Sequence, residues 1–193
     1  MKFSLIVILL SLLNNPTLLI NSQVKSYLDK LETDFDEILF VSIDNQKMYH
    51  FKKQKIISTY VISSSKYGVG NQSGSNKTPK GLHFIKNKIG DNTPINGKMI
   101  GRKFTGEIAK IFSDKTISDT DDITTRILWL SGLEKGVNKG ENIDSFKRYI
   151  YIHGTSEEGR LGIPSSHGCI RMKNKDVIDL YKKVEVGTLV LIL

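Results

Sequence analysis

Hydrophobic positions repeat every second residue over much of the chain, which is the period of a β-strand. Residues 38–43 and 47–51 carry such runs, and the turn-forming residues Asp44-Asn45-Gln46 between them predict a hairpin. Residues 55–63 are β-branched and aromatic and predict a third strand that pairs with the hairpin. Further strands are expected at residues 82–86, 107–112, 125–131, 148–153 and 188–193.

Two segments carry apolar residues at helical spacing instead. Residues 23–36 predict a lead-in helix that serves as a spacer rather than as a second domain. A second helix is expected to start with Asn174 as its N-cap and to run to about Lys183. Many short strands, Gly-rich connections and one or two short helices predict a mainly β fold, either a sandwich or a barrel.

Three long polar segments interrupt the strands, at residues 64–81, 87–101 and 132–144. Loops of this length often have a function, so the first two are candidates for a substrate lid. Ordinary surface loops are the alternative interpretation.

The N-terminus is typical of a signal peptide. Lys2 precedes an apolar run over residues 3–13, which Asn14-Asn15-Pro16 interrupts before the roughly twenty residues of a membrane span are reached. Residues 1–22 are therefore expected to direct export to the periplasm or cell envelope, with cleavage before Gln23. A retained membrane anchor is the alternative. Residues 37–193 are expected to form one domain.

The formal net charge is +8, and lysines supply most of it along the whole chain. There is no arginine-rich stripe with interleaved aromatic residues, so nucleic acid is not an expected partner. A polyanionic cell envelope is a more natural neighbour for such a surface.

Candidate chemistry concentrates around the single cysteine. Two histidines, Cys169 and Arg171 fall within residues 153–171 of a chain that has only four histidines. One cysteine in an exported protein forms no intramolecular disulfide, so Cys169 is either a buried inert thiol or a free nucleophile. A nearby imidazole such as that of His153 can take the thiol proton and hold a thiolate at lowered pKa.

The residue before the cysteine is a glycine, Gly168, which permits a tight turn with positive φ. Such a turn can aim several backbone amides at one point and form an oxyanion hole, where each donor is worth about 3 kcal/mol. Arg171 lies two residues beyond the cysteine and suits either a substrate carboxylate or a structural carbonyl contact.

His153-Gly154-Thr155, followed by Ser166-His167-Gly168-Cys169-Ile170-Arg171-Met172, resembles the signature of the YkuD-type L,D-transpeptidases. The resemblance extends to Thr78-Pro79-Lys80-Gly81 and to Gly187-Thr188 before the final strand. It covers about residues 37–193 and is weakest over residues 87–142. It implies a YkuD-like β-sandwich or barrel that forms an L,D-transpeptidase catalytic domain.

The resemblance also implies roles for individual residues. Cys169 is the expected nucleophile and His153 its base, with the imidazole oriented by the main-chain carbonyl of Gly154. The residues expected to supply oxyanion amides or to shape the pocket are His167, Gly168, Ser166 and Arg171.

The implied reaction is acyl transfer on peptidoglycan stem peptides. The cysteine forms a thioester with the third stem residue and releases D-Ala, after which an amine acceptor takes the acyl group. The acceptor stays open between the side-chain amine of another stem, a lysine of an envelope protein and a free D-amino acid, and no cofactor is expected. Hydrolysis of the same stems is the alternative within enzymes, and a non-catalytic envelope-binding domain is the alternative outside them.

A zinc site formed by His153, His167 and Cys169 is a competing hypothesis, since these are zinc ligand types. Their spacing lacks a metal-site pattern, and a metal-bound thiolate would be blocked as a nucleophile, so no metal is expected. For His167 a structural role in holding the turn stays as open as a catalytic one.

Overall fold

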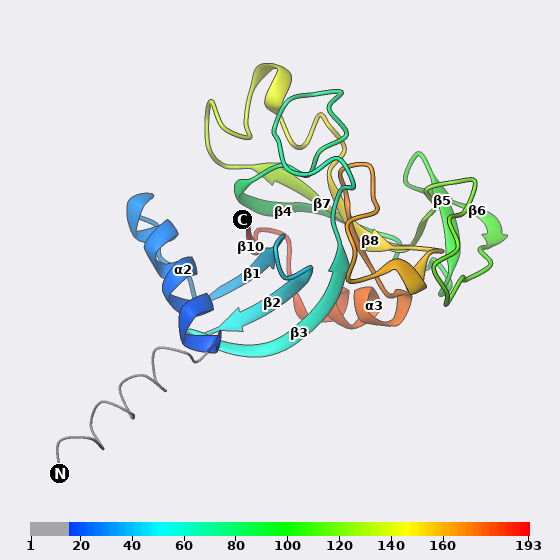
Figure 1. The fold of residues 1–193 in the computed structure, drawn as a ribbon, viewed down its shortest axis with the longest axis horizontal. Helices are drawn as coiled ribbons and strands as arrows, with labels where there is room; N and C mark the ends of the chain where they lie inside the picture. The colour runs from blue at the N-terminus through cyan, green and yellow to red at the C-terminus, as the bar shows by residue number, and fades with distance from the viewer. Residues whose placement is uncertain (1–15) are drawn as a thin grey trace, which may run out of the picture.

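The computed structural model describes residues 16–193 (Figure 1). The apolar run predicted as part of a signal peptide lies outside these residues. The described chain forms α2 (Pro16–Lys30) and α3 (Asn174–Lys183), the short 3-10 helices η1 (Glu141–Ile143) and η2 (Glu158–Arg160), and ten strands. The strands are β1 (Glu37–Ser42), β2 (Lys47–Lys52), β3 (Lys55–Ser63), β4 (Gly81–Ile89), β5 (Gly97–Ile100), β6 (Lys103–Ile108), β7 (Ile123–Gly132), β8 (Tyr151–Gly154), β9 (Ile170–Met172) and β10 (Leu189–Ile192).

The sheet closes on itself into a barrel. Its strand order is β4-β10-β1-β2-β3-β9-β8-β7-β5-β6, and β4 also pairs with β7. The additional pairing joins the strands from β4 round to β7 into a ring, while β5 and β6 extend outward from β7. The prediction of a mainly β sandwich or barrel is confirmed, and closure leaves the ring without a free edge.

Alternation along the strands divides their side chains between the interior and the outer surface. On β1, Leu39 and Val41 belong to the large interior core, whereas Ile38 and Phe40 belong to a second cluster outside the ring. Ile152 on β8 and Ile170 on β9 also face the interior. A third, smaller cluster lies outside β7 and β8 and is formed by Met99, Ile127 and Tyr151, with Ile89, Ile123, Trp129 and Cys169 packed against it.

Helix α2 covers the outer side of β1 and β2. Its Val24 and Leu28 are each 1% exposed and pack in the same cluster as Ile38 and Phe40. The Tyr27 hydroxyl donates to the carboxylate of Glu134, which attaches the helix to the loop after β7. The helix starts and ends earlier than the predicted segment 23–36, and it runs continuously across the expected cleavage position between Ser22 and Gln23.

Helix α3 packs against β7 and β8 and closes the interior core with Val177, Leu180 and Tyr181. The prediction that Asn174 caps this helix is wrong, because Lys173 occupies the N-cap position. The Asn174 side chain instead donates to Thr155 and Glu158 and accepts from two threonines of β7. It links the helix to the strands.

The hairpin, the third strand and the strand over residues 125–131 are confirmed as β1, β2, β3 and β7. The polar segment 87–101 was expected to be a loop, but it contains the end of β4 and all of β5. The strand expected over residues 148–153 begins only at Tyr151, because Tyr149 has a φ of 56° and breaks the extended conformation.

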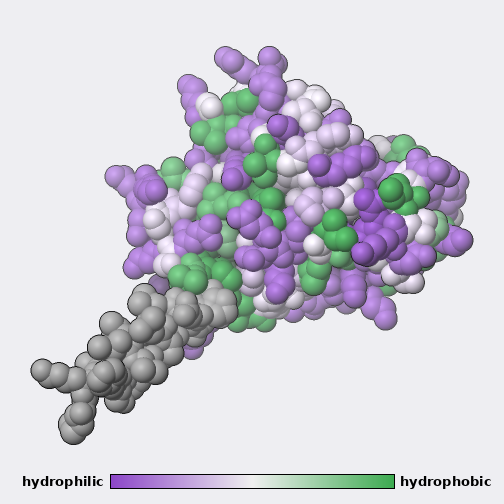
Figure 2. Space-filling model, in the orientation of Figure 1, coloured by the Kyte–Doolittle hydropathy of each residue, from purple (hydrophilic) through white to green (hydrophobic). Residues whose placement is uncertain are grey.

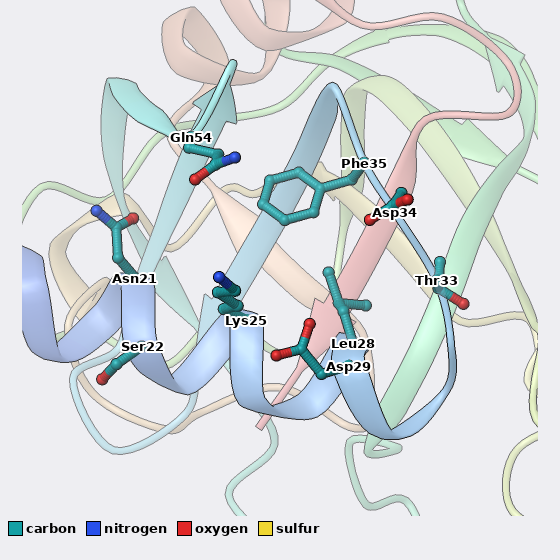
Figure 3. A pocket seen from close by; sticks show the side chains of 9 residues that line it. All are labelled: Asn21, Ser22, Lys25, Leu28, Asp29, Thr33, Asp34, Phe35 and Gln54. Atoms are coloured by element: carbon teal, nitrogen blue, oxygen red, sulfur yellow. The ribbon is translucent and has the colours of Figure 1, made fainter.

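The outer surface is mostly hydrophilic in the view of Figure 2, with small groups of hydrophobic residues between the polar ones. Within residues 16–193, neither long helix has the length and apolar character that crossing a membrane requires. A hollow of about 180 Å³ lies between α2 and the chain that follows it, where Leu28 and Phe35 meet Lys25, Asp29 and Gln54 (Figure 3). It belongs to the α2 side of the barrel.

Candidate active site

The predicted nucleophile and base lie on the outer face of two neighbouring parallel strands. Ile152 of β8 pairs with Ile170 of β9, and both face the interior. Because side chains alternate along a strand, His153 on β8 and Cys169 immediately before β9 both point outward. Cys169 accordingly packs against the third hydrophobic cluster, together with Trp129.

The imidazole of His153 is buried, with 1% of the residue exposed. Its Nδ1 lies 2.7 Å from the carbonyl oxygen of Gly154, which is the contact that the resemblance implied. Because a carbonyl oxygen only accepts hydrogen bonds, Nδ1 carries the proton of the neutral ring and Nε2 keeps its lone pair. Burial lowers the pKa of His153 below 6.5, although the charge of Asp121 and the Gly154 carbonyl oppose this. The ring is therefore a neutral base at neutral pH.

The Cys169 side chain is held by the backbone of two tyrosines. Its Sγ donates to the carbonyl oxygen of Tyr149 at 3.4 Å and accepts from the N–H of Tyr151 at the same distance. Tyr149 has a positive φ of 56°. In this arrangement the thiol hydrogen bond goes to a backbone carbonyl rather than to His153.

The expected thiolate with a lowered pKa is not what the structure shows. Burial raises the pKa of Cys169 to about 12, and the N–H of Tyr151 and two nearby arginines only partly offset this. The thiol and the imidazole are thus both neutral at rest.

The turn before Cys169 has the predicted conformation, with a φ of 127° at Gly168. Ser166 organises it, because its hydroxyl donates to the carbonyl oxygen of Cys169 at 2.6 Å and accepts from the N–H of Gly168 at 3.2 Å. The Gly168 amide is therefore already engaged. Of the backbone amides in this turn, those of His167 and Cys169 remain as candidate donors to an oxyanion.

The loop over residues 64–81 is fastened to this turn. The hydroxyl of Thr78, in the Thr-Pro-Lys-Gly segment, donates to the carbonyl oxygen of Gly168 at 3.1 Å. Lys66 N–H donates to the carbonyl oxygen of Ser166 at 3.1 Å. Arg148, just before β8, donates to three carbonyl oxygens of the loop, those of Gly70, Asn71 and Lys77. These bonds favour a fixed wall over a mobile lid.

Arg171 and His167 are held by carboxylates. The guanidinium of Arg171 is 2% exposed and donates to Glu157 at 2.7 Å and to Asp121 at 2.6 Å, so its partners are side chains rather than a carbonyl. Nδ1 of His167 lies 2.7 Å from the same Asp121 carboxylate. Burial raises the pKa of Asp121, but the charge of Arg171 and the hydrogen bonds from His167 and Arg171 act the other way, and the pKa is lowered.

The residues within 16–193 form no group of three or more histidine, cysteine or acidic side chains with the geometry to hold a metal ion. Of the three ligands in the zinc hypothesis, His167 turns to Asp121, and Cys169 bonds to backbone groups.

The sequence of the chain was compared with models of known protein families. Residues 36–192 match the family model described as YkuD, the L,D-transpeptidase catalytic domain. The chain belongs to this family. The match begins at the start of β1 and ends at β10, so it takes in the whole ring of strands, with α2 lying before it.

Short segments of the chain are also similar to curated L,D-transpeptidases. The probable L,D-transpeptidase YbiS of Escherichia coli K12 is 46% identical over 41 residues, which are 21% of this chain and 13% of that protein. The putative L,D-transpeptidase YkuD of Bacillus subtilis 168 is 50% identical over 46 residues, 24% of this chain and 28% of that protein. The matches thus span less than a third of these relatives' own lengths.

Solved structures show the same fold at low sequence identity. An L,D-transpeptidase from Xylanimonas cellulosilytica superimposes with a TM-score of 0.52 at 16% identity, over 89% of this chain and 69% of that one. An Enterococcus faecium L,D-transpeptidase gives a TM-score of 0.51 at 19% identity, over 82% of this chain and 50% of that one.

Several residues of this L,D-transpeptidase domain that shape the site were not predicted. Asp121 and Glu157 hold Arg171, and the backbone of Tyr149 and Tyr151 holds the thiol. The burial of Arg171, which calls for a carboxylate partner, is visible only in the folded structure. The sequence did not single out Asp121 among the twenty acidic residues, since it stands in an otherwise unremarkable polar segment.

Proposed function

We propose that this chain is a peptidoglycan L,D-transpeptidase in which Cys169 attacks the stem peptide and His153 acts as its base. The observation that carries the proposal is the placement of both side chains on one outer face of adjacent strands. The tautomer of His153 supports it, because the Gly154 carbonyl leaves Nε2 as the proton acceptor.

In the first step, Sγ of Cys169 attacks the carbonyl carbon of the third stem residue while its proton passes to Nε2 of His153. The amides of His167 and Cys169 are the proposed donors to the oxyanion, in a turn that Ser166 and Gly168 hold in shape. Collapse of the tetrahedral intermediate breaks the peptide bond, and the D-Ala amine leaves with the proton from His153. A thioester on Cys169 remains.

In the second step, an acceptor attacks the thioester and the sulfur leaves, with His153 again moving the proton. A side-chain amine of a second stem gives a cross-link, a lysine of an envelope protein gives protein anchoring, and water gives a carboxypeptidase. Arg171 has its charge paired by Asp121 and Glu157, so we assign it a part in shaping the pocket rather than in binding a substrate carboxylate.

The test uses the purified chain and synthetic tetrapeptide stems. Released D-Ala and acyl products are measured by mass spectrometry with a second stem, a lysine-containing peptide or water alone as acceptor. The proposal expects D-Ala release together with an amide-linked product. Release with only trimmed stems would identify a hydrolase. Stems that bind without releasing D-Ala would identify a non-catalytic binding domain.

We further propose that the chain is exported and keeps the whole of α2 on the barrel, which is the alternative to cleavage before Gln23. Ile20, before the expected cleavage position, and Val24, after it, pack in one cluster on the barrel. Cleavage before Gln23 would remove the first part of this helix. The intact mass of the protein from the envelope fraction tests the proposal, and a chain that begins at Gln23 would contradict it.

A further inference from the structure

The tip of the β5–β6 hairpin carries an arginine in an unusual backbone conformation. Ile100 pairs with Lys103, so Gly101 and Arg102 form a two-residue turn. Both have positive φ, 56° and 66°, as the tight hairpin turns of type I′ require. Glycine or asparagine is favoured at such positions, and an arginine there carries a steric cost that glycine avoids. An unfavourable residue at a turn points to a role for its side chain.

Three aromatic residues of the site hold that side chain. The guanidinium carbon of Arg102 lies 4.7 Å from the ring centroid of Trp129 and 5.5 Å from that of Tyr149. Its Nη1 donates to the hydroxyl of Tyr151 at 3.3 Å. Trp129 stacks in turn on Phe146 at 4.0 Å, and its indole N–H donates to the Phe146 carbonyl oxygen. The aromatic group is therefore itself fixed.

The same two tyrosines contact Cys169. Tyr149 accepts from the thiol through its carbonyl, and Tyr151 donates to the sulfur through its N–H. Their side chains reach Arg102 while their backbone reaches the sulfur. A substrate whose carbonyl sits at Cys169 would therefore have its neighbouring groups close to this guanidinium.

Arg102 is also a partly exposed cation of this region whose charge is left without a carboxylate. Arg171 is paired with two carboxylates, and Arg148 donates to three loop carbonyls. Within residues 16–193, Arg102 forms no ion pair, and its side chain is partly exposed. A guanidinium stacked on aromatic rings keeps N–H groups in its plane that can bind a carboxylate.

We propose that Arg102 binds a carboxylate of the donor stem next to the bond that Cys169 attacks, and so determines which stems are substrates. The assignment rests on the proposed function. Two carboxylates have this chemistry: one on the side chain of the third residue, as in diaminopimelate, and the terminal carboxylate of D-Ala.

The test measures kcat and KM for release of the fourth residue from four tetrapeptides. One has diaminopimelate as its third residue, one has the side-chain carboxamide of that residue, one has lysine, and one has diaminopimelate but ends in D-alaninamide. The proteins are the unmodified chain, Arg102→Gln and Arg102→Lys. Lys103→Gln is the matched control, because it removes a charge from the next, exposed position of the same turn.

For the unmodified chain, neutralising the bound carboxylate is expected to lower kcat/KM roughly ten- to a hundredfold, mainly through KM. Arg102→Gln should lose this discrimination, and Arg102→Lys should recover part of it because it keeps the charge without the planar fork. Lys103→Gln should behave like the unmodified chain. The neutralised stem on which the unmodified chain loses kcat/KM shows whether Arg102 binds the side-chain carboxylate of the third residue or the terminal carboxylate of D-Ala.

Equal loss on all four stems in Arg102→Gln would overturn the assignment and indicate a purely structural contact. Equal activity of the unmodified chain on all four would overturn it as well. If no stem releases its fourth residue although a carbapenem still acylates Cys169, the proposed function fails and this assignment fails with it.

Discussion

Two parts of the barrel's outer surface are built from the same alternating strands but are completed in different ways. Outside β1 and β2 the outward residues are apolar, and α2 covers them with Ile20, Val24 and Leu28. Outside β8 and β9 the outward residues include His153, Cys169 and Arg171, and neither α-helix of residues 16–193 packs on this face. These two parts point toward opposite ends of the molecule, marked by α2 and by the β5–β6 hairpin (Figure 1).

The difference follows from the kind of contact that the side chains on each surface require. Apolar side chains need only a complementary apolar cover, which any amphipathic helix can supply. Buried polar side chains each need a specific partner, and here Asp121, Glu157 and the Gly154 carbonyl supply them. Changes on the α2 side should therefore alter stability, and changes on the other side should alter activity.

The largest effect is expected for His153→Ala. Loss of the base should lower the rate of D-Ala release about a thousandfold, since general bases contribute roughly 10²–10⁴-fold. The unfolding midpoint should change little by comparison. His167→Asn is the matched control. The His167 side chain contacts Asp121, so this substitution should lower the rate of D-Ala release far less. Equal losses in the two variants would contradict the assignment of His153 as the base.

The complementary change is Leu28→Ala on α2. Removing this buried side chain should lower the free energy of unfolding by about 2–5 kcal/mol, measured by denaturant titration, and leave kcat unchanged. Leu19→Ala on the same helix is the control. Leu19 is 56% exposed, so this substitution should lower the free energy of unfolding by under about 0.5 kcal/mol. A Leu28→Ala protein as stable as the control would show that α2 does not pack on the barrel in solution.

The pH dependence of kcat/KM should show that the His153 imidazole and the Cys169 thiol are both neutral at neutral pH. Because burial lowers the pKa of His153 below 6.5, the base stays neutral through neutral pH, and activity falls only at more acidic pH. Because the pKa of Cys169 is raised to about 12, no alkaline step from thiol ionisation is expected between pH 7 and roughly 10. An activity rise near pH 8.5 that requires Cys169 would contradict this account.

The smallest effect is expected for Asp121→Asn. Its carboxylate raises the pKa of both His153 and Cys169, so its loss should move the acid limb of the activity profile to lower pH. The maximal rate should fall about tenfold as His167 and Arg171 lose a charged partner. Asp119→Asn, at an exposed position nearby, should leave the profile unchanged. A loss of activity without any shift of the acid limb would indicate a purely structural role.

The sequence predicted those features that depend on local pattern. The alternation in residues 38–63 predicts β1, β2 and β3, and Gly168 permits the positive-φ turn that the structure contains. It did not predict that β4 pairs with β7, because closure of a barrel depends on contacts between distant segments.

Within the site, residue types were predictable and their partners were not. His153 and Cys169 stand out by rarity and by the motif around them. Asp121 binds Arg171 across fifty positions of sequence, and nothing local marks it. The pKa of Cys169 depends on burial, which only the packed structure shows.

The most direct test of the central claim is the intact mass of the protein after rapid mixing with a tetrapeptide stem. We expect an adduct equal to the stem without its D-Ala, located on Cys169 by peptide mapping and absent from Cys169→Ala. Formation of the adduct should be slowed about a thousandfold in His153→Ala. An adduct at another residue, or D-Ala release by Cys169→Ala at the unmodified rate, would contradict the account.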